Sequence, residues 1–123
     1  MNNKVFATPA DAIKDIFDGA VVMLGGFGNP GLPQTLVKAL LEKGVRDLTF
    51  ICDTCLEPRE QEYDIAALVD HGRVSRLITT FVGRPDHMPP VVDLWRKGGI
   101  TIEVMPQGIL TERMRSSAVG LSL

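Results

Sequence analysis

Apolar and polar residues are grouped in blocks along this chain, and the blocks predict four strands. The first strand, over residues 20–24, contains the continuous apolar run Val21-Val22-Met23-Leu24. A run without alternation is typical of a strand that is covered on both faces, as in a parallel sheet. Similar short runs predict strands over residues 48–52, 74–81 and 100–105. Segments with helical spacing separate the four runs.

Those intervening segments predict five helices. Thr8-Pro9-Ala10-Asp11 combines a hydroxyl cap, a proline and an acid, which is typical of a helix start. A second helix is predicted to begin at Pro33 and to end at Gly44. The others are predicted over residues 63–70, from residue 90 to residues 98–99, and after residue 108. The residues expected to form the apolar sides of these helices are Ile13, Ile16, Phe17, Leu36, Val37, Leu40, Leu41, Val91, Val92, Leu94, Trp95, Ile109, Leu110 and Met114.

The alternation of strands and helices predicts an α/β fold with a largely parallel sheet, in a three-layer α/β/α arrangement. In such sheets ligands bind beyond the carboxyl ends of the strands. Four segments of this chain follow predicted strands, namely residues 25–31, 52–55, 80–83 and 106–108. They should therefore share one edge of the sheet.

Composition limits the function classes. The chain has 123 residues, of which 45% are hydrophobic and 23% charged, and we expect residues 1–123 to form a single α/β domain. A net charge of −2 argues against a nucleic-acid surface. No apolar run is long enough to span a membrane, and the first residues lack the apolar core of a signal peptide. We therefore expect a cytoplasmic protein with neither nucleic acid nor a membrane as its partner.

The glycine-rich loop after the first strand allows two interpretations. Gly26-Phe27-Gly28-Asn29-Pro30-Gly31 matches G-x-G-x-x-G, and Asp53 ends the next strand near the spacing of a ribose-binding acid. However, Pro30 and Pro33 interrupt the place where a nucleotide-binding helix normally begins. A non-catalytic nucleotide-binding or subunit-interaction domain is therefore the alternative to the function described below.

The motif Cys52-Asp53-Thr54-Cys55 raises the question of redox or metal chemistry. A C-x-x-C after a strand can lower the pKa of a thiol if a helix begins there. Zinc would need two further ligands, and the spacing of His71 and His87 fits no common zinc pattern. We therefore expect no metal, and we expect Cys52 and Cys55 to be reduced, partly buried residues that flank a turn.

The loop and its flanks match a family signature. The segment from Asp18 to Pro33 resembles the signature of the family I CoA-transferases at every specified position. The specified positions are Asp18-Gly19, Val22-Met23-Leu24, Gly25-Gly26-Phe27, Gly31 and Pro33, with gaps of two, three and one residues after Gly19, Phe27 and Gly31. Residues 44–49, 72–83 and 106–113 also resemble segments of that family, although Met105 stands where many members have threonine. The resemblance covers residues 4–120. It indicates the α subunit of an acetate or 3-oxoacid CoA-transferase, which works in ketone-body and fatty-acid metabolism.

The resemblance implies a reaction. Family members move CoA between carboxylic acids through a glutamyl-CoA intermediate, with CoA and acyl-CoA as substrates and no permanently bound cofactor. Attack on a thioester carbonyl creates an oxyanion, which needs fixed hydrogen-bond donors. Suitable donors are the N–H groups of the glycine loop and the carboxamide of Gln107, which is the counterpart of an active-site residue. The loop residues expected near the substrate are Gly25, Gly26, Phe27, Gly28 and Gly31, with Phe27 either in the core or forming a wall of the pocket. Without the resemblance, Gln107 would be interpreted as a solvated turn residue and the loop as a plain turn.

The resemblance also implies a partner. The nucleophilic glutamate of the family lies in the β subunit, and none of the glutamates here lies in its motif. The chain resembles a carboxy-terminally truncated α subunit, as from a shortened or split gene or a partial chain. We therefore expect a hetero-oligomer in which a β subunit completes the site, and no activity without that partner.

Overall fold

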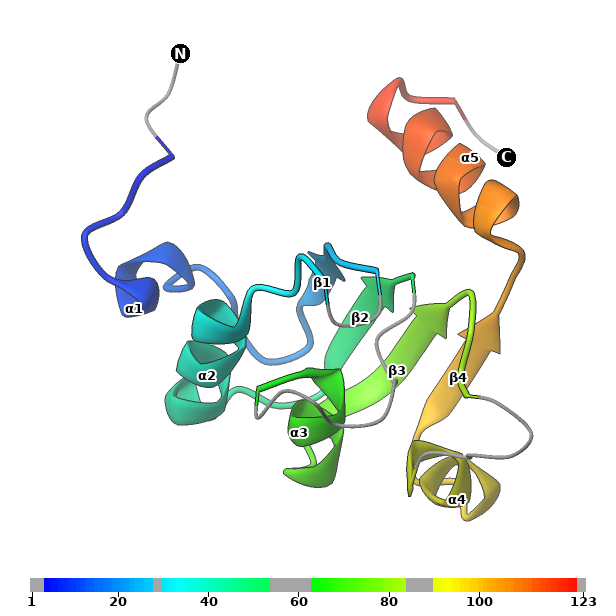
Figure 1. The fold of residues 1–123 in the computed structure, drawn as a ribbon, viewed down its shortest axis with the longest axis horizontal. Coiled ribbons are helices and arrows are strands. Elements are labelled where there is room, and N and C mark those ends of the chain that lie inside the picture. Colours follow the sequence, from blue (N-terminus) through cyan, green and yellow to red (C-terminus); the bar gives the residue numbers. More distant parts are fainter. Residues whose placement is uncertain (1–3, 28–29, 54–62, 84–89, 122–123) are drawn as a thin grey trace.

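The sheet has four parallel strands in the order β1-β2-β3-β4 (Figure 1). In this computed structural model the described residues are 4–27, 30–53, 63–83 and 90–121. The strands are β1 (Val21–Leu24), β2 (Leu48–Cys52), β3 (Val74–Thr79) and β4 (Thr101–Val104). The helices are α1 (Pro9–Ala12), α2 (Gln34–Lys43), α3 (Ile65–Asp70), α4 (Pro90–Arg96) and α5 (Gln107–Ala118). The α/β class and the parallel sheet predicted from the sequence are confirmed.

The helix ends follow local sequence chemistry. Thr8 caps α1, and its side chain accepts a hydrogen bond from the backbone N–H of Asp11. Gly44 caps the carboxyl end of α2 in the left-handed conformation, with a φ of 78°. Pro33 is the residue before α2 rather than its first residue, so the predicted start is one residue early.

The hydrophobic core lies between one face of the sheet and helices α1 to α4. Val22, Phe50, Leu77 and Ile102 form a row across all four strands on that face, and Phe50 and Leu77 are fully buried. The buried helix residues in the same cluster are Ile13, Val37, Leu40, Ile65, Leu68, Val91 and Val92. A strand order that follows the sequence, with right-handed crossovers, brings the connecting helices to one side of the sheet.

Several residues expected to be buried are exposed instead. Phe17, Trp95, Ile109 and Met114 expose between 41% and 68% of their surface. Val21 and Met23 of β1 are also more than half exposed, so the expectation that this strand is covered on both faces is wrong. A continuous apolar run therefore does not distinguish a strand with one open face from a fully covered one.

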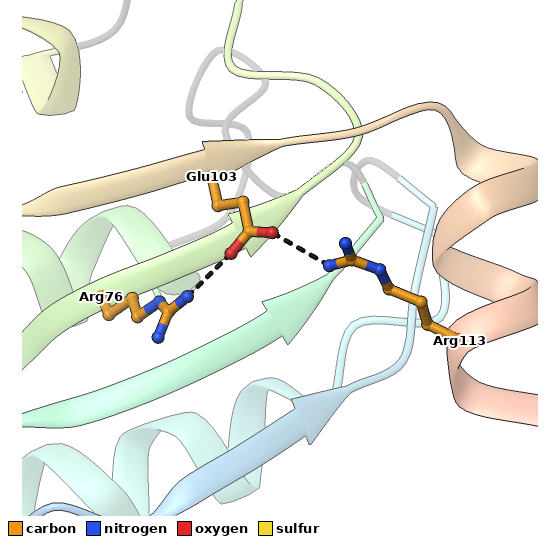
Figure 2. Close-up of polar contacts among 3 residues, drawn as sticks. All are labelled: Arg76, Glu103 and Arg113. Atoms are coloured by element: carbon orange, nitrogen blue, oxygen red, sulfur yellow. Dashed lines mark hydrogen bonds and ion pairs between the residues drawn. The ribbon is translucent and has the colours of Figure 1, made fainter. Parts of the chain in front are cut away.

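The second face of the sheet carries an ionic cluster. The Arg76 Nη2 of β3 donates to the Glu103 Oε2 of β4 at 2.7 Å, and the Arg113 Nη1 of α5 donates to Glu103 Oε1 at 2.9 Å. Figure 2 shows the Glu103 carboxylate between the two guanidinium groups. These two hydrogen bonds hold the pKa of Glu103 below its ordinary value. Through Arg113, α5 approaches the face opposite α2, α3 and α4, as a three-layer arrangement requires.

Candidate functional site

The segments that follow the four strands meet at one edge of the sheet, as the sequence predicts. The backbone N–H of Thr80, after β3, donates to the carbonyl of Asp53, after β2, at 3.2 Å. The Gln107 Nε2, after β4, donates to the Asp53 Oδ2 at 3.0 Å. Figure 1 shows α5 standing beyond the arrowheads of the strands at this edge.

A hollow of about 230 Å³ opens at this edge. Its lining comprises Met23, Leu24, Gly25, Gly26, Ile51, Cys52, Asp53, Gln107, Leu110, Thr111 and Met114. Met23 and Ile51 are register partners on neighbouring strands and form an apolar floor. Leu110 and Met114 of α5 form an apolar wall. The polar side chains of Asp53, Gln107 and Thr111 lie in the same lining. The hollow therefore combines apolar walls with a few polar groups, which is typical of a small-molecule site.

The glycine loop reaches this hollow with Gly25 and Gly26. Gly26 has a φ of 127°, and a Cβ there would lie 3.4 Å from the backbone nitrogen of Leu32. Gly31 has a φ of 79°, and a Cβ there would lie 3.6 Å from the Gly26 Cα. The loop is closed by a hydrogen bond from the Phe27 N–H to the Pro30 carbonyl at 3.0 Å. The positive φ therefore favours glycine at Gly26 and Gly31, whereas a Cβ at either position would make only ordinary contacts.

The remaining described residues of the glycine loop do not line the hollow. Phe27 is 67% exposed, so it is not a core residue, and it is absent from the lining of the hollow. Gly31 supports Gly26 from behind rather than lining the hollow. Gly28 lies outside the described residues.

Gln107 is the first residue of α5, directly after Pro106, and its side chain is exposed at the hollow. The Asp53 carboxylate can only accept hydrogen bonds, so the amide nitrogen of Gln107 must face it. Within the described part of the chain, Asp53 is the only partner of this carboxamide. The second N–H and the oxygen of Gln107 are therefore available to a ligand.

From the sequence, Asp53 is a candidate only as the ribose-binding acid of the less favoured dinucleotide alternative. In the structure its carboxylate lies against Gln107 and Thr80. The Thr80 hydroxyl donates to Asp53 Oδ1, and the Thr79 hydroxyl donates to the Asp53 carbonyl. Its position directly after the strand next to the glycine loop was a usable signal for a place in the site.

Cys52 differs from the expectation of a reduced thiol. It is buried, and it is disulfide-bonded in the structure, so that expectation is wrong. Cys55 lies outside the described residues. Across residues 4–27, 30–53, 63–83 and 90–121, no group of three or more histidine, cysteine, aspartate or glutamate residues is arranged to hold a metal ion.

The glutamates of the described segments lie away from the hollow. Glu42 pairs with Lys38 at 3.9 Å on the exposed side of α2, and Glu112 pairs with Arg115 at 2.7 Å on α5. Glu103 is bound by two arginines on the second face of the sheet. None of these three carboxylates lines the hollow. Glu57, Glu60 and Glu62 lie outside the described residues.

A larger hollow of about 650 Å³ lies between α1 and α2, and Lys43 is part of its lining. There the Lys43 Nζ donates to the carbonyls of Ile13, Lys14 and Ile16 at 2.6–3.0 Å. This ammonium group therefore satisfies backbone groups at and after the end of α1. The smaller hollow at the strand ends holds the convergent polar groups and is the candidate site. No helix in the described segments is long and apolar enough to span a membrane.

Comparison with known proteins agrees with this fold and shows the family. The family model "Coenzyme A transferase" matches residues 6–123, so the chain belongs to the coenzyme A transferase family. It is 38% identical to one subunit of the 3-oxoadipate CoA-transferase of Pseudomonas putida, over 98% of this chain and 51% of that protein. It is also 38% identical to the alpha subunit of a probable coenzyme A transferase of Bacillus subtilis, over 89% of this chain and 45% of that protein. The chain thus spans about half the length of these relatives.

Solved structures give the same result. Glutaconate coenzyme A-transferase from Acidaminococcus fermentans superposes with a TM-score of 0.74 at 25% identity, over 97% of this chain and 37% of that one. A variant of the decarboxylase AibA/AibB superposes with a TM-score of 0.76 at 25% identity, over 94% of this chain and 44% of that one. The predicted CoA-transferase-like fold is therefore confirmed.

Proposed function

We propose that this chain supplies the α-subunit part of a CoA-transferase site, which moves CoA between short-chain acyl-CoA and carboxylic acids. The observation that carries the proposal is that the glycine loop and Gln107 line one hollow at the strand ends. Membership of the coenzyme A transferase family supports the reaction class. Relatives that are themselves named as single subunits of such enzymes, one of them as an alpha subunit, support a β-type partner.

The chemistry follows from the donors in the hollow. When a carboxylate attacks a thioester carbonyl, negative charge develops on the carbonyl oxygen. The free N–H of Gln107 and the backbone N–H groups near Gly25 and Gly26 are neutral donors suited to that oxygen. Such hydrogen bonds would be strengthened in the assembled site, where a partner subunit covers the hollow and excludes water. The nucleophile in this proposal is a glutamate of the partner, which forms the glutamyl-CoA intermediate.

The dinucleotide alternative is less well supported. In a dinucleotide fold the helix begins within the glycine motif, so that its amino end faces the pyrophosphate. Here α2 begins at Gln34, three residues after Gly31, and Pro33 precedes it without a side-chain cap. The acid Asp53 is bound to Gln107 and Thr80 rather than projecting alone. We therefore expect no permanently bound dinucleotide. From the sequence we separately expect no metal and a cytoplasmic location.

The test is replacement of Gln107 in the complex of this chain with its β-type partner. Loss of one oxyanion donor costs about 10²–10³ in rate in other enzymes. We expect Gln107→Ala to lower kcat by at most that factor, with little change in melting temperature because the side chain is exposed. Gln34→Ala, the same change at the first residue of α2 and outside the lining of the hollow, is the matched control and should retain most activity. A lower melting temperature without any loss of rate would assign Gln107 a structural role only.

A further inference from the structure

The hollow contains one acidic side chain and, in the described segments, no basic one. The polar residues of its lining are Asp53, Gln107 and Thr111, with Cys52 at its base. Arg113 lies on α5, as Gln107 does, but its Nη1 pairs with the Glu103 Oε1 at 2.9 Å. Arg76 is bound to the same carboxylate at 2.7 Å. Both arginine side chains are therefore engaged by Glu103, and neither belongs to the lining of the hollow.

The carboxylate of Asp53 is fixed in place by neutral donors. Gln107 holds Oδ2 at 3.0 Å, and the Thr80 hydroxyl holds Oδ1. The Asp53 carbonyl accepts from the Thr80 N–H at 3.2 Å and from the Thr79 hydroxyl. Among the described residues, Asp53 has no cationic partner. Hydrogen bonds from neutral groups position a carboxylate but leave its charge in place.

The remainder of the lining is apolar. Met23 and Ile51 form the floor, and Leu24, Leu110 and Met114 extend it. A volume of about 230 Å³ accommodates a short aliphatic chain. Burial of each methylene on such a surface improves binding about fourfold. A carboxylate at the far end of the chain would instead lose its water and face the charge of Asp53.

We propose that this hollow binds the acyl chain, and that Asp53 makes it selective for acyl groups without a second carboxylate. This inference rests on the function proposed above, and it adds the substrate class. Butyrate and succinate are a matched pair for testing it, because they differ only in a terminal methyl or carboxylate group. Asp53 is thus a specificity-determining residue as well as the residue that orients Gln107.

The experiment compares acids as CoA acceptors with the complex of this chain and its partner. We expect kcat/KM to rise about fourfold per methylene from acetate to butyrate, and to be at least tenfold lower for succinate than for butyrate. Asp53→Asn should lower the ratio of kcat/KM for butyrate to kcat/KM for succinate at least fivefold. This should hold even if both values of kcat/KM fall because Gln107 is less well oriented. Asp93→Asn, the same change on the exposed side of α4, should leave the ratio unaltered.

A second variant and a binding measurement keep the test decisive. Met114→Arg adds a cation to a partly exposed helical position in the lining and should favour succinate. Calorimetric titration of the complex with butyryl-CoA and succinyl-CoA tests the hollow without turnover. Absence of transfer with tighter binding of butyryl-CoA would refute the proposed function and retain this inference. The inference would be overturned if the complex used or bound succinyl groups as well as, or better than, butyryl groups. If that complex still transferred CoA, the proposed function would remain intact.

Discussion

Among single residues, Gly26 has the most demanding backbone. Its φ of 127° is rarely adopted by residues with a side chain, and it lies beside Leu32 at the edge of the hollow. We expect Gly26→Ala to cost about 1–3 kcal/mol of folding stability and to lower kcat/KM at least tenfold, because the loop must shift its N–H groups. Chemical denaturation and the CoA-exchange assay of the assembled complex measure the two effects.

A matched glycine separates strain from catalysis. Gly98 has a φ of 74° with open space around its Cβ position, and it follows α4 away from the hollow. Gly98→Ala should therefore lower stability in the same way but leave kcat/KM unchanged. Unchanged kinetics in Gly26→Ala as well would show that the loop is only a tight turn.

The sequence predicted some site residues but not their contacts. Gln107 was predictable because it follows a strand and a proline, and the glycines were predictable from their motif. The Asp53–Gln107 hydrogen bond joins residues 54 positions apart. Its existence depends on where β2 and β4 end relative to each other, and the exact ends of strands are the part of a fold that sequence patterns predict least well.

At the scale of elements, Glu103 joins three of them. It binds Arg76 of β3 and Arg113 of α5 from its own place on β4, and both contacts lower its pKa. A carboxyl whose pKa is lower in the folded state stabilises the fold above its unfolded pKa of about 4.3. That stabilisation disappears as the pH falls through the lower, folded value.

The corresponding prediction concerns pH. Glu103→Gln should destabilise the chain at pH 7, and the difference from wild type should shrink steadily as the pH falls below about 4.3. Added salt should weaken the effect at pH 7 because the cluster is partly exposed. Urea denaturation midpoints at several pH values measure it, with Glu112→Gln on the exposed side of α5 as the control. A stability difference that stays constant down to pH 2.5 would contradict the ionic explanation.

Lys43 connects α2 to the end of α1. Its ammonium group donates to three carbonyls of the segment Ile13–Ile16. Hydrogen bonds from charged groups contribute about 1.5–3 kcal/mol each when they are removed, with partial compensation by water at this exposed site. We expect Lys43→Met to cost about 1–2 kcal/mol in total and to increase amide hydrogen exchange in residues 9–16.

Lys14→Met is the control, because it makes the same change on an exposed side chain in the same region. Exchange rates in residues 9–16 that match wild type in Lys43→Met would show that α1 is held by its apolar contacts alone. Sequence patterning placed Ile13 correctly in the core but failed for Phe17. Helix α1 is only four residues long, so the apolar stripe expected beyond it has no helix to follow.

For the whole molecule, the order of elements was predictable and the covering of the second face was not. Alternating strands and helices define a parallel sheet, and the strand order follows the sequence. That order places the three connecting helices α2, α3 and α4 on one face, so Val21 and Met23 remain exposed on the other. Apolar residues on a strand indicate which of its faces could be buried. The topology of the sheet determines which face is actually covered by helices.

The central claim is that this chain positions substrates in a CoA-transfer site but does not supply the nucleophile. In the described segments, Glu42, Glu103 and Glu112 are held in ion pairs outside the hollow. A site with donors but no nucleophile cannot form a covalent intermediate. We therefore expect the chain alone to be inactive and to gain activity when it is combined with a β-type partner.

The most direct test is CoA exchange between acetyl-CoA and butyrate, measured with this chain alone, with the partner alone and with the two together. We predict turnover only in the mixture, and its loss when the partner's nucleophilic glutamate is changed to glutamine. Turnover by the single chain, abolished by changing one of its own glutamates, would contradict the central claim and place the nucleophile here.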